Sequence, residues 1–263
     1  MRDERGGLVS VDGDAVHATI VTAAGGDAIG TTAESGSENY RAADGLRSWQ
    51  SHAVTSAPRG ELELAATELV ADRPFAAVAR TDDDLEILHE LAARLAERAA
   101  DPTRPTGWQH WRGDAADSLL LVPSWERLET LANPAGVGFF GQLRPDPDGP
   151  FPPHLERSVA AAGARAGWLL AYFNVRFLEP APDGARRYGN LVLIASREQA
   201  RALAHDADHG EAVRLSSGAY RSIRIHRLEL EGVATRRPAI RVRETLYLDF
   251  TDSPPWRAVR TCS

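Results

Sequence analysis

A repeated order of strand-like and helix-like segments, starting at residue 75, leaves few folds open to this chain. Residues 75–80 (FAAVAR) predict a short strand. Residues 81–100 predict a helix capped by Thr81 or Asp82, because Leu and Ala recur on one face at helical spacing. Two strands, a short helix and an apolar strand follow: GWQHWRGD at 107–114, SLLLVPSW at 118–125, ERLETLAN at 126–133 and GVGFFGQL at 136–143. The order is therefore β-α-β-β-α-β.

The same order recurs in the second half of the chain. Its segments are a helix at 154–165, strands at 167–180 and 190–196, a helix at 197–208 and a strand at 220–232. Aligning the Gly-Trp pairs at 107–108 and 167–168 superposes the apolar strand and the helix that follow each pair, which indicates an internal duplication. Each copy has the ferredoxin-like order, in which two helices cover one face of a four-stranded antiparallel sheet. We therefore expect an α+β protein with tandem ferredoxin-like units.

The units have approximate boundaries. We expect N-terminal strands and a long loop in 1–70, a first unit in 71–140 and a second unit in 137–250, whose last strand (239–250) closes a sheet edge. The strand at 137–142 is assigned to both units. The N-terminal strands are expected at 15–24, 45–54 and 61–70, and the Gly-, Ser- and Thr-rich residues 25–60 include a long loop or mobile lid.

Composition excludes several function classes. The chain of 263 residues has a formal charge of −7 and contains no lysine, so Schiff-base chemistry and a Walker-type phosphate loop are excluded. The acidic balance argues against nucleic acid, and Cys262, the single cysteine, excludes an intrachain disulfide. Neither a signal peptide nor an apolar membrane span is evident. We therefore expect a cytoplasmic protein that binds neither nucleic acid nor membrane.

Known sequence motifs add little. GVGFFG fits a dinucleotide-binding pattern at Gly136, Gly138 and Gly141, but a helix precedes it and Pro145 and Pro147 follow it, whereas that pattern requires a preceding strand and a following helix. The nucleophile elbow G-x-S-x-G and the zinc motif H-E-x-x-H do not occur.

His205 and His209 are four residues apart in ALAHDADHGEA. On an unbroken helix they would share a face and could bind one metal ion. Gly210 is expected to end the helix, however, and no third ligand converges on the pair. Two interpretations remain ahead of a metal site: histidines at a helix C-terminus, or a proton-transfer group at the edge of a pocket. We expect no metal.

Two strands carry aromatic and hydrogen-bonding side chains on a single face. Alternation places Leu170, Tyr172, Asn174 and Arg176 on one face of the first strand, and Tyr220, Ser222, Arg224 and His226 on one face of the second. If the faces coincide, Tyr172, Asn174, Tyr220, Arg224 and His226 converge on one cavity. A histidine or tyrosine would then take a phenolic proton while Asn174 or an arginine stabilises the oxyanion. A solvent-facing sheet surface is the alternative.

The tryptophan-rich strand at 107–114 alternates Trp108, His110 and Arg112 against Gln109 and Trp111. These rings either pack in the core or form a wall that stacks on an aromatic substrate or flavin. Trp168 is the matching residue of the second unit.

Residues 75–232 resemble the antibiotic biosynthesis monooxygenase family. The resemblance rests on the run TGWQHWRGDAADSLLLVPSWERLETLANP and on NLVLIASREQARALAHDADHGEAV in the second unit. It implies a dimeric α+β barrel that oxidises polyketide-derived phenols and quinols, often without a metal or prosthetic group. Duplicated chains of this length are similar to ring-opening oxygenases of angucycline biosynthesis, which are thought to use reduced flavin supplied by a partner reductase. The long N-terminal segment and SREQA in place of Trp-Glu depart from the family pattern.

We therefore expect an oxygenase for a polycyclic aromatic polyketide that uses dioxygen. Reduced flavin (FADH2 or FMNH2) would be a diffusible cosubstrate, with a flavin reductase as partner and a homodimer as the assembly. A cofactor-free cyclase or isomerase and a non-catalytic protein that binds a hydrophobic metabolite are the alternatives, with haem binding as a remote variant of the latter.

Overall fold

The computed structural model describes residues 61–131, 133–144, 153–179, 186–196, 207–232 and 238–262. The strands expected at 15–24 and 45–54, the loop expected at 25–60, and His205 lie outside these residues.

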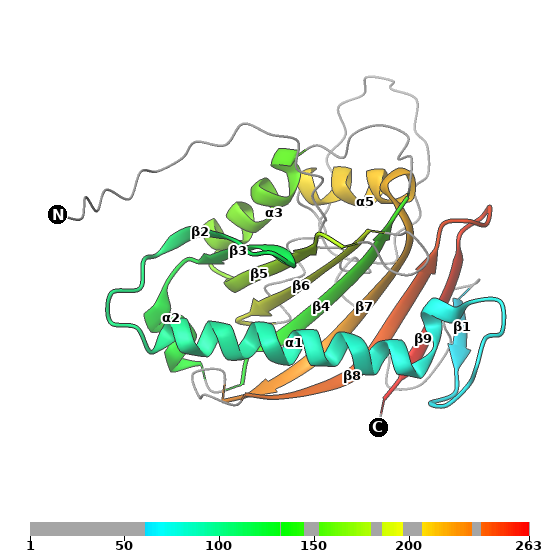
Figure 1. Ribbon diagram of the computed structural model, residues 1–263, viewed down its shortest axis with the longest axis horizontal. Coiled ribbons are helices and arrows are strands. Elements are labelled where there is room, and N and C mark those ends of the chain that lie inside the picture. The colour runs from blue at the N-terminus through cyan, green and yellow to red at the C-terminus, as the bar shows by residue number, and fades with distance from the viewer. Residues whose placement is uncertain are drawn as a thin grey trace, which may run out of the picture.

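The described residues form one nine-stranded sheet (Figure 1). Its order is β1-β9-β8-β7-β4-β6-β5-β3-β2, and all neighbours are antiparallel except β1 and β9. The strands are β1 (Glu61–Leu64), β2 (Gly107–Arg112), β3 (Ala116–Val122), β4 (Ala135–Leu143), β5 (Leu169–Phe177), β6 (Arg187–Ile194), β7 (Tyr220–Glu231), β8 (Ala239–Asp249) and β9 (Trp256–Thr261).

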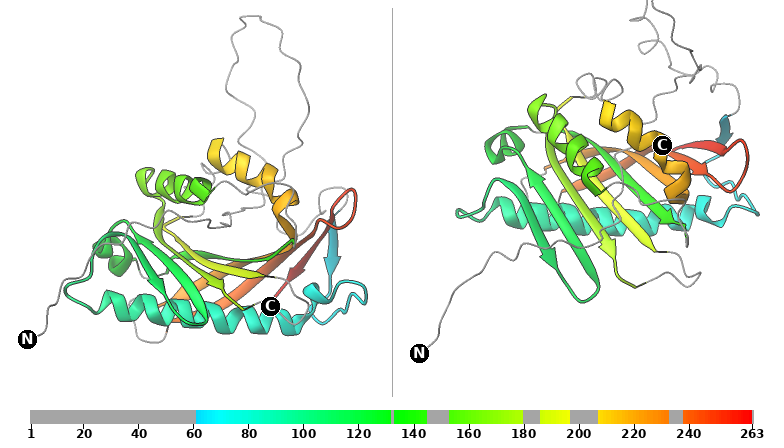
Figure 2. Two further views of the ribbon diagram at one scale, coloured as in Figure 1. Left: turned by 45° about the horizontal axis from the view of Figure 1, so that its top comes forward. Right: turned by 90° about the horizontal axis from the view of Figure 1, so that it is seen from above.

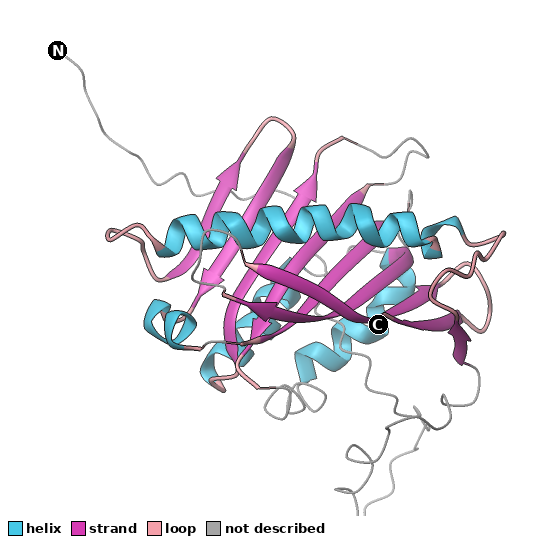
Figure 3. Cartoon of the chain, turned by 90° about the horizontal axis from the view of Figure 1, so that it is seen from below, coloured by secondary structure: helices cyan, strands magenta, loops and turns pink. Residues whose placement is uncertain are grey.

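Helices cover both faces of this sheet. The helical segments are a 3-10 turn η2 (Pro74–Ala76), α1 (Val78–Ala99), α2 (Trp125–Thr130), α3 (Pro153–Arg165) and α5 (Ala207–Ala219). The sheet lies between α1 on one side and α3 and α5 on the other (Figure 2), and α1 runs across the strands (Figure 3). Among the described helices, none combines the length and apolar character needed to cross a membrane.

Each face has its own apolar core. Leu88, Leu91 and Leu95 of α1 pack against the sheet together with Trp125 of α2. On the other face, α3 contributes Leu155, Val159 and Ala160, and α5 contributes Ala212 and Ala219. We call these the α1 face and the α3 face. The strands between them are apolar on both sides, which explains the nearly continuous hydrophobic runs of β5 and β6.

The expected second unit follows its predicted order of elements. The chain runs β4-α3-β5-β6-α5-β7, and these strands lie in the sheet as β7-β4-β6-β5, with α3 and α5 on the same face. The helix expected at 197–208 falls mostly outside the described residues. Gly210 does not end a helix, because α5 continues from Ala207 to Ala219. His209 therefore lies in the first turn of α5 and not at a C-terminus, which corrects the sequence interpretation.

A separate sheet for the first unit is not formed in the described residues. Residues 75–80 are not a strand; they span the end of η2 and the start of α1. Both edges of β4 are occupied by β6 and β7, while the β2–β3 hairpin pairs with β5 at the far side. A strand has two edges, and both edges of β4 are taken by strands of the second unit. The hairpin therefore cannot pair with β4, and it joins the same sheet through β5.

The predicted start of α1 and the predicted edge strand of the sheet also need correction. Helix α1 begins at Val78 after Ala77, which makes no side-chain capping bond, so neither Thr81 nor Asp82 is the cap. Thr81 is instead buried on the inner side of the helix. The strand at 239–250 forms as β8 but is not an edge, because β9 pairs with it and β1 lies beyond β9.

The glycines of GVGFFG lie inside β4 and serve packing. A Cβ at Gly138 would lie 2.9 Å from Leu88 Cδ1, so Gly138 lets α1 approach the sheet closely. A Cβ at Gly141 would overlap the Tyr220 ring on the other face. The motif is therefore not a nucleotide-binding loop.

Candidate functional site

Two buried polar clusters lie on opposite faces of the sheet. The Glu156 cluster, on the α3 face, consists of Glu156, Tyr172, Asn174 and Tyr188. The Asp84 cluster, on the α1 face, consists of Asp84, Arg224, His226 and Thr245. All eight residues are less than a tenth exposed. Buried hydrogen-bond networks of this kind are costly to build, so both are candidates for function.

In the Glu156 cluster, one carboxylate oxygen accepts three hydrogen bonds. The Tyr172 hydroxyl, the Asn174 amide and the Tyr188 hydroxyl all donate to Glu156 Oε1, the last over 3.0 Å. The two tyrosine oxygens are also 2.6 Å apart. Glu156 comes from α3, whereas the donors come from β5 and β6, so the network ties the helix to the sheet.

The tyrosines of this cluster are held in their protonated form. Burial, followed by the negative charge of Glu156, raises the pKa of Tyr172 well above its ordinary value. The same two causes, in the same order, raise the pKa of Tyr188. At neutral pH the cluster is therefore a carboxyl group facing two phenols that donate hydrogen bonds, a proton-transfer arrangement within a medium of low dielectric constant.

Beside this cluster lies an unsatisfied amide. Asn174 Oδ1 accepts a hydrogen bond from the Leu119 backbone N–H over 3.0 Å, so its side chain uses both its donor and its acceptor. Asn190 pairs with Asn174 across β5 and β6, is fully buried, and has no hydrogen-bond partner for either amide atom among the described residues. A buried polar group left unpaired needs a physical explanation, and a ligand or water group is one.

Aromatic rings extend the cluster. The Phe139 ring contacts those of Tyr188 and Tyr220 edge to face, at centroid distances of 6.1 and 5.6 Å. On the other side, Trp108 meets Tyr172 at 6.2 Å and is 37% exposed. The Arg157 guanidinium of α3 lies over the Trp108 ring, at 5.8 Å. Trp108 is therefore a partly exposed ring in edge-to-face contact with the fully buried Tyr172.

The Asp84 cluster is built around an ion pair. Arg224 donates two hydrogen bonds to Asp84, over 2.6 and 2.8 Å, and His226 Nε2 lies 2.9 Å from Asp84 Oδ2. His226 Nδ1 shares a hydrogen bond with Thr245 Oγ1. Burial raises the pKa of Asp84, but the Arg224 charge and the hydrogen bonds from Arg224 and His226 outweigh it and lower the pKa below its ordinary value. Both ring nitrogens of His226 are therefore engaged, one with Asp84 and the other with Thr245.

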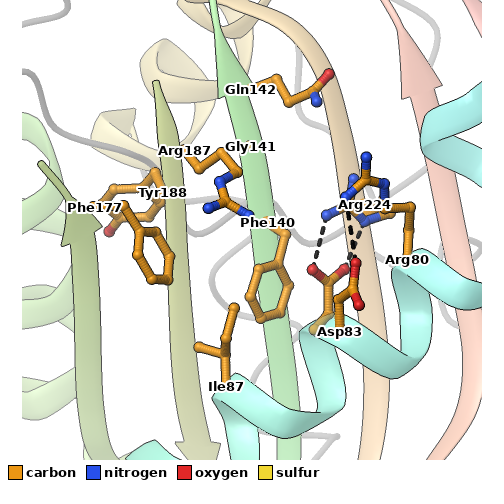
Figure 4. Close-up of a pocket in the computed structure, with 11 residues that line it drawn as sticks. Arg80, Asp83, Ile87, Phe140, Gly141, Gln142, Phe177, Arg187, Tyr188 and Arg224 are labelled. Carbon is orange, nitrogen blue, oxygen red and sulfur yellow. Dashed lines mark hydrogen bonds and ion pairs between the residues drawn. The ribbon is translucent and has the colours of Figure 1, made fainter. Parts of the chain in front are cut away.

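A small cavity opens beside Asp84 on the α1 face (Figure 4). It encloses about 30 Å³ and is lined by side chains of Arg80, Arg187, Arg224 and Phe140, among others. A second cavity of about 120 Å³ shares Arg80 and Gln142 with the first.

The expected convergence of five residues on one cavity is wrong. Tyr172, Asn174 and Tyr220 lie on the α3 face, whereas Arg224 and His226 point toward α1. The register of β7 on β4 shifts between Gln142 and Leu143, a β-bulge that turns Tyr220 to the opposite face from Arg224. Simple alternation along the strand therefore fails at this point.

The remaining predicted residues are dispersed. Trp108 and the exposed His110 lie on the α3 side of β2, whereas Trp111 lies on the α1 side, 6.1 Å from Phe173, so the tryptophans do not form one stacking wall. Trp168 is a core residue that packs against Gly163 of α3. Arg176 is half-buried on β5, and His209 is buried on α5.

Sequence reasoning missed the two acids that organise the clusters. Glu156 lies between Leu155 and Val159 on the buried side of α3, and Asp84 lies one turn before Leu88 on the buried side of α1. The sequence signal for both acids was a carboxylate within the apolar stripe of an amphipathic helix, a position where a charged side chain is buried only with partners.

Two polar residues of β6 were also missed. The strand was expected to begin at Asn190, whereas β6 begins at Arg187, so Tyr188 was assigned to the preceding turn. Asn190 was then the first residue of a strand, where a polar side chain is unremarkable and gives no signal of burial.

Comparison with protein-family models, with curated proteins and with solved structures gives no match to this chain. Among the described residues, no three His, Cys, Asp or Glu side chains are grouped so that they could hold a metal ion.

Proposed function

We propose that the protein is an oxygenase that acts with dioxygen on a phenol or quinol of the polycyclic aromatic polyketide type, and that Glu156 accepts the phenolic proton. The observation that carries the proposal is the buried Glu156 cluster, beside which the Asn190 amide has no partner among the described residues. Removing a phenolic proton leaves an electron-rich ring, which is the form that reacts with dioxygen.

The chemistry of the cluster supports this role. The carboxylate of Glu156 is a general base in a dry environment, and Tyr172 and Tyr188 are proton donors whose raised pKa keeps them protonated. The Asn190 amide would donate a hydrogen bond to the phenolate oxygen. The strand order β7-β4-β6-β5, with α3 and α5 on one face, also supports the family resemblance because it is the ferredoxin-like order.

Access to the cluster involves Trp108. The ring of Trp108 contacts Tyr172 edge to face and is partly exposed. A polycyclic ligand needs roughly 300 Å³ or more. We therefore propose that the Trp108 side chain moves aside when substrate binds. The homodimer that the resemblance implies remains a prediction.

Reduced flavin does not fit the described cavities. Two cavities among the described residues enclose about 30 and 120 Å³, and both lie beside Arg80 at the start of α1, whereas Glu156 lies on α3. The proton transfer proposed for Glu156 does not require flavin.

An oxygen electrode tests the proposal. Purified protein is mixed with a polycyclic phenol, with and without reduced flavin, and oxygen uptake is recorded. We expect uptake by the wild type and a loss of about 100-fold or more in Glu156→Gln, the usual range for removing a general base. Glu211→Gln is the matched control, because Glu211 lies on the neighbouring α5 but is exposed and paired with Arg214.

The alternatives give different results. Substrate conversion without oxygen uptake, still dependent on Glu156, would indicate a cyclase or isomerase, which also needs an acid–base pair. Binding without conversion would indicate a metabolite-binding protein. Uptake that is equal in Glu156→Gln and in wild type would exclude Glu156 as the base.

A further inference from the structure

Arg187, on the α1 face, is a cation without a counter-ion among the described residues. Its Nε atom is buried and has no hydrogen-bond partner, and within the described part of the chain neither an ion pair nor a hydrogen bond reaches its guanidinium. Its packing partner is the Phe177 ring, 5.2 Å away. A partly buried charge that lacks a partner is costly, so such a guanidinium favours binding of an anion.

The surroundings of Arg187 differ from those of its neighbours. Arg224 is neutralised by Asp84, and Arg80 forms an ion pair with Asp83. The cavity between them is therefore lined by three arginines and two aspartates, with Arg187 supplying the excess positive charge. Figure 4 shows the Arg187 guanidinium between the Phe177 and Phe140 side chains.

The cavity is of a size for a single small polar group. Its volume is about 30 Å³. One water molecule needs roughly 10–15 Å³ of such space, so the cavity can hold two oxygen atoms of one anionic group. The larger cavity, of about 120 Å³, is its neighbour, because Arg80 and Gln142 line both. That second cavity is lined by two further arginines, Arg73 and Arg221, and by two aspartates, Asp72 and Asp249, both of which form ion pairs with Arg73. A ligand with an anionic head and a short body would fill both.

We propose that Arg187 binds the oxyanion group of a small metabolite, a carboxylate or a phosphate, with the rest of the ligand extending past Arg80 into the second cavity. A guanidinium pairs with either group through two parallel hydrogen bonds. Tyr188 of the Glu156 cluster also lines the first cavity, but the three arginines lie on the α1 face, so the site does not depend on the function proposed for Glu156.

Calorimetric titration of the full chain with succinate and, separately, with inorganic phosphate tests the site at an ionic strength held constant with sodium chloride. We expect saturable binding of at least one of the two. Arg187→Met should weaken it by tenfold or more, because both hydrogen bonds and the charge are lost. Arg214→Met is the matched control, since Arg214 is exposed on α5 on the opposite face and is paired with Glu211. Its affinity should equal that of the wild type.

The stability of the unliganded variant gives a second measurement. If Arg187 has no counter-ion, the unliganded Arg187→Met variant should melt at the same temperature as the wild type or higher. Adding the anion should raise the melting temperature of the wild type but not that of the variant. Should Arg187→Met fail to fold, Arg80→Gln replaces it, because Arg80 is half exposed at the cavity mouth, and it should weaken binding severalfold. Absence of saturable binding for both anions, or unchanged affinity in the variants, would overturn the site. The tighter of the two anions identifies the head group.

Discussion

Asp84 and Glu156 are buried carboxylates in similar positions, each on the inner side of a helix that faces the sheet. Their partners differ. The Arg224 guanidinium compensates the charge of Asp84, and His226 is hydrogen-bonded to the same carboxylate, whereas Tyr172, Asn174 and Tyr188 donate hydrogen bonds to Glu156 from neutral groups. The first arrangement stabilises the ionised acid firmly. In the second, the carboxylate lies against two phenol groups, and for this reason we place the proposed proton transfer at Glu156.

Replacing Asp84 by Asn should destabilise the protein strongly. The change leaves Arg224 buried without its counter-ion, a situation that typically costs about 3–5 kcal/mol. The free energy of unfolding, measured by urea denaturation, gives the result. Asp83→Asn is the matched control: this neighbouring aspartate is 58% exposed and pairs with Arg80, so its loss should cost about 0–1 kcal/mol. Equal losses in the two variants would contradict the buried ion pair.

Alkaline pH should unfold the protein through the tyrosines of the Glu156 cluster. Their pKa is raised in the folded state, so above pH 10.0, the ordinary value, an unfolded chain releases these protons while the folded chain keeps them. The stability contribution is complete below pH 10.0 and is lost as pH rises above it. Unfolding free energies between pH 8 and pH 11 should fall less steeply in Tyr188→Phe than in the wild type. An identical slope would show that Tyr188 titrates normally.

Within the helices and strands, glycine is required where a neighbouring element packs so closely that a Cβ would clash with it. Gly138 lets α1 reach β4, and an added methyl group would meet Leu88 at 2.9 Å. Gly210 is different, because a Cβ there would meet no atom within 4 Å although the residue lies inside α5. The two glycines should therefore respond to alanine in opposite directions.

We expect Gly138→Ala to lower the free energy of unfolding by about 1–3 kcal/mol, as overpacking does. Gly210→Ala should raise it by about 0.5–1 kcal/mol, because alanine favours the helix. Thermal and denaturant melts of the two variants measure both changes. A stabilised Gly138→Ala variant would mean that α1 does not lie against β4 as described.

Most element types follow from local pattern. Period-two and helical spacings predicted α1, α2, α3 and the strands from β2 to β8, each within a few residues of its observed bounds. The misses have physical causes. Residues 75–80 have strand-like composition, but Val78 onward joins α1, whose inner side takes up Thr81 and Asp84. In β7, a bulge separates the face of Tyr220 from that of Arg224, and residue types do not encode such a bulge strongly.

Across the molecule as a whole, the single sheet has consequences for cooperativity. Strand β4 pairs with β6 and β7, and the β2–β3 hairpin is reached only through β5, so the two predicted units share their central strand. We expect the described residues to unfold in a single transition. Far-ultraviolet circular dichroism and tryptophan fluorescence should give coincident melting curves. Two separated transitions would indicate independent units after all.

Local pattern in the chain was enough to predict most element types, the acidic and lysine-free character, and the presence of tyrosine, asparagine and arginine on strands of one sheet. It could not predict which of these side chains meet. Face and partner depend on strand order, on the bulge in β7 and on which helix covers which side, and these are set by contacts between distant segments. For that reason Tyr172 meets Glu156 of α3, Arg224 meets Asp84 of α1, and Arg187 faces a cavity without a partner among the described residues.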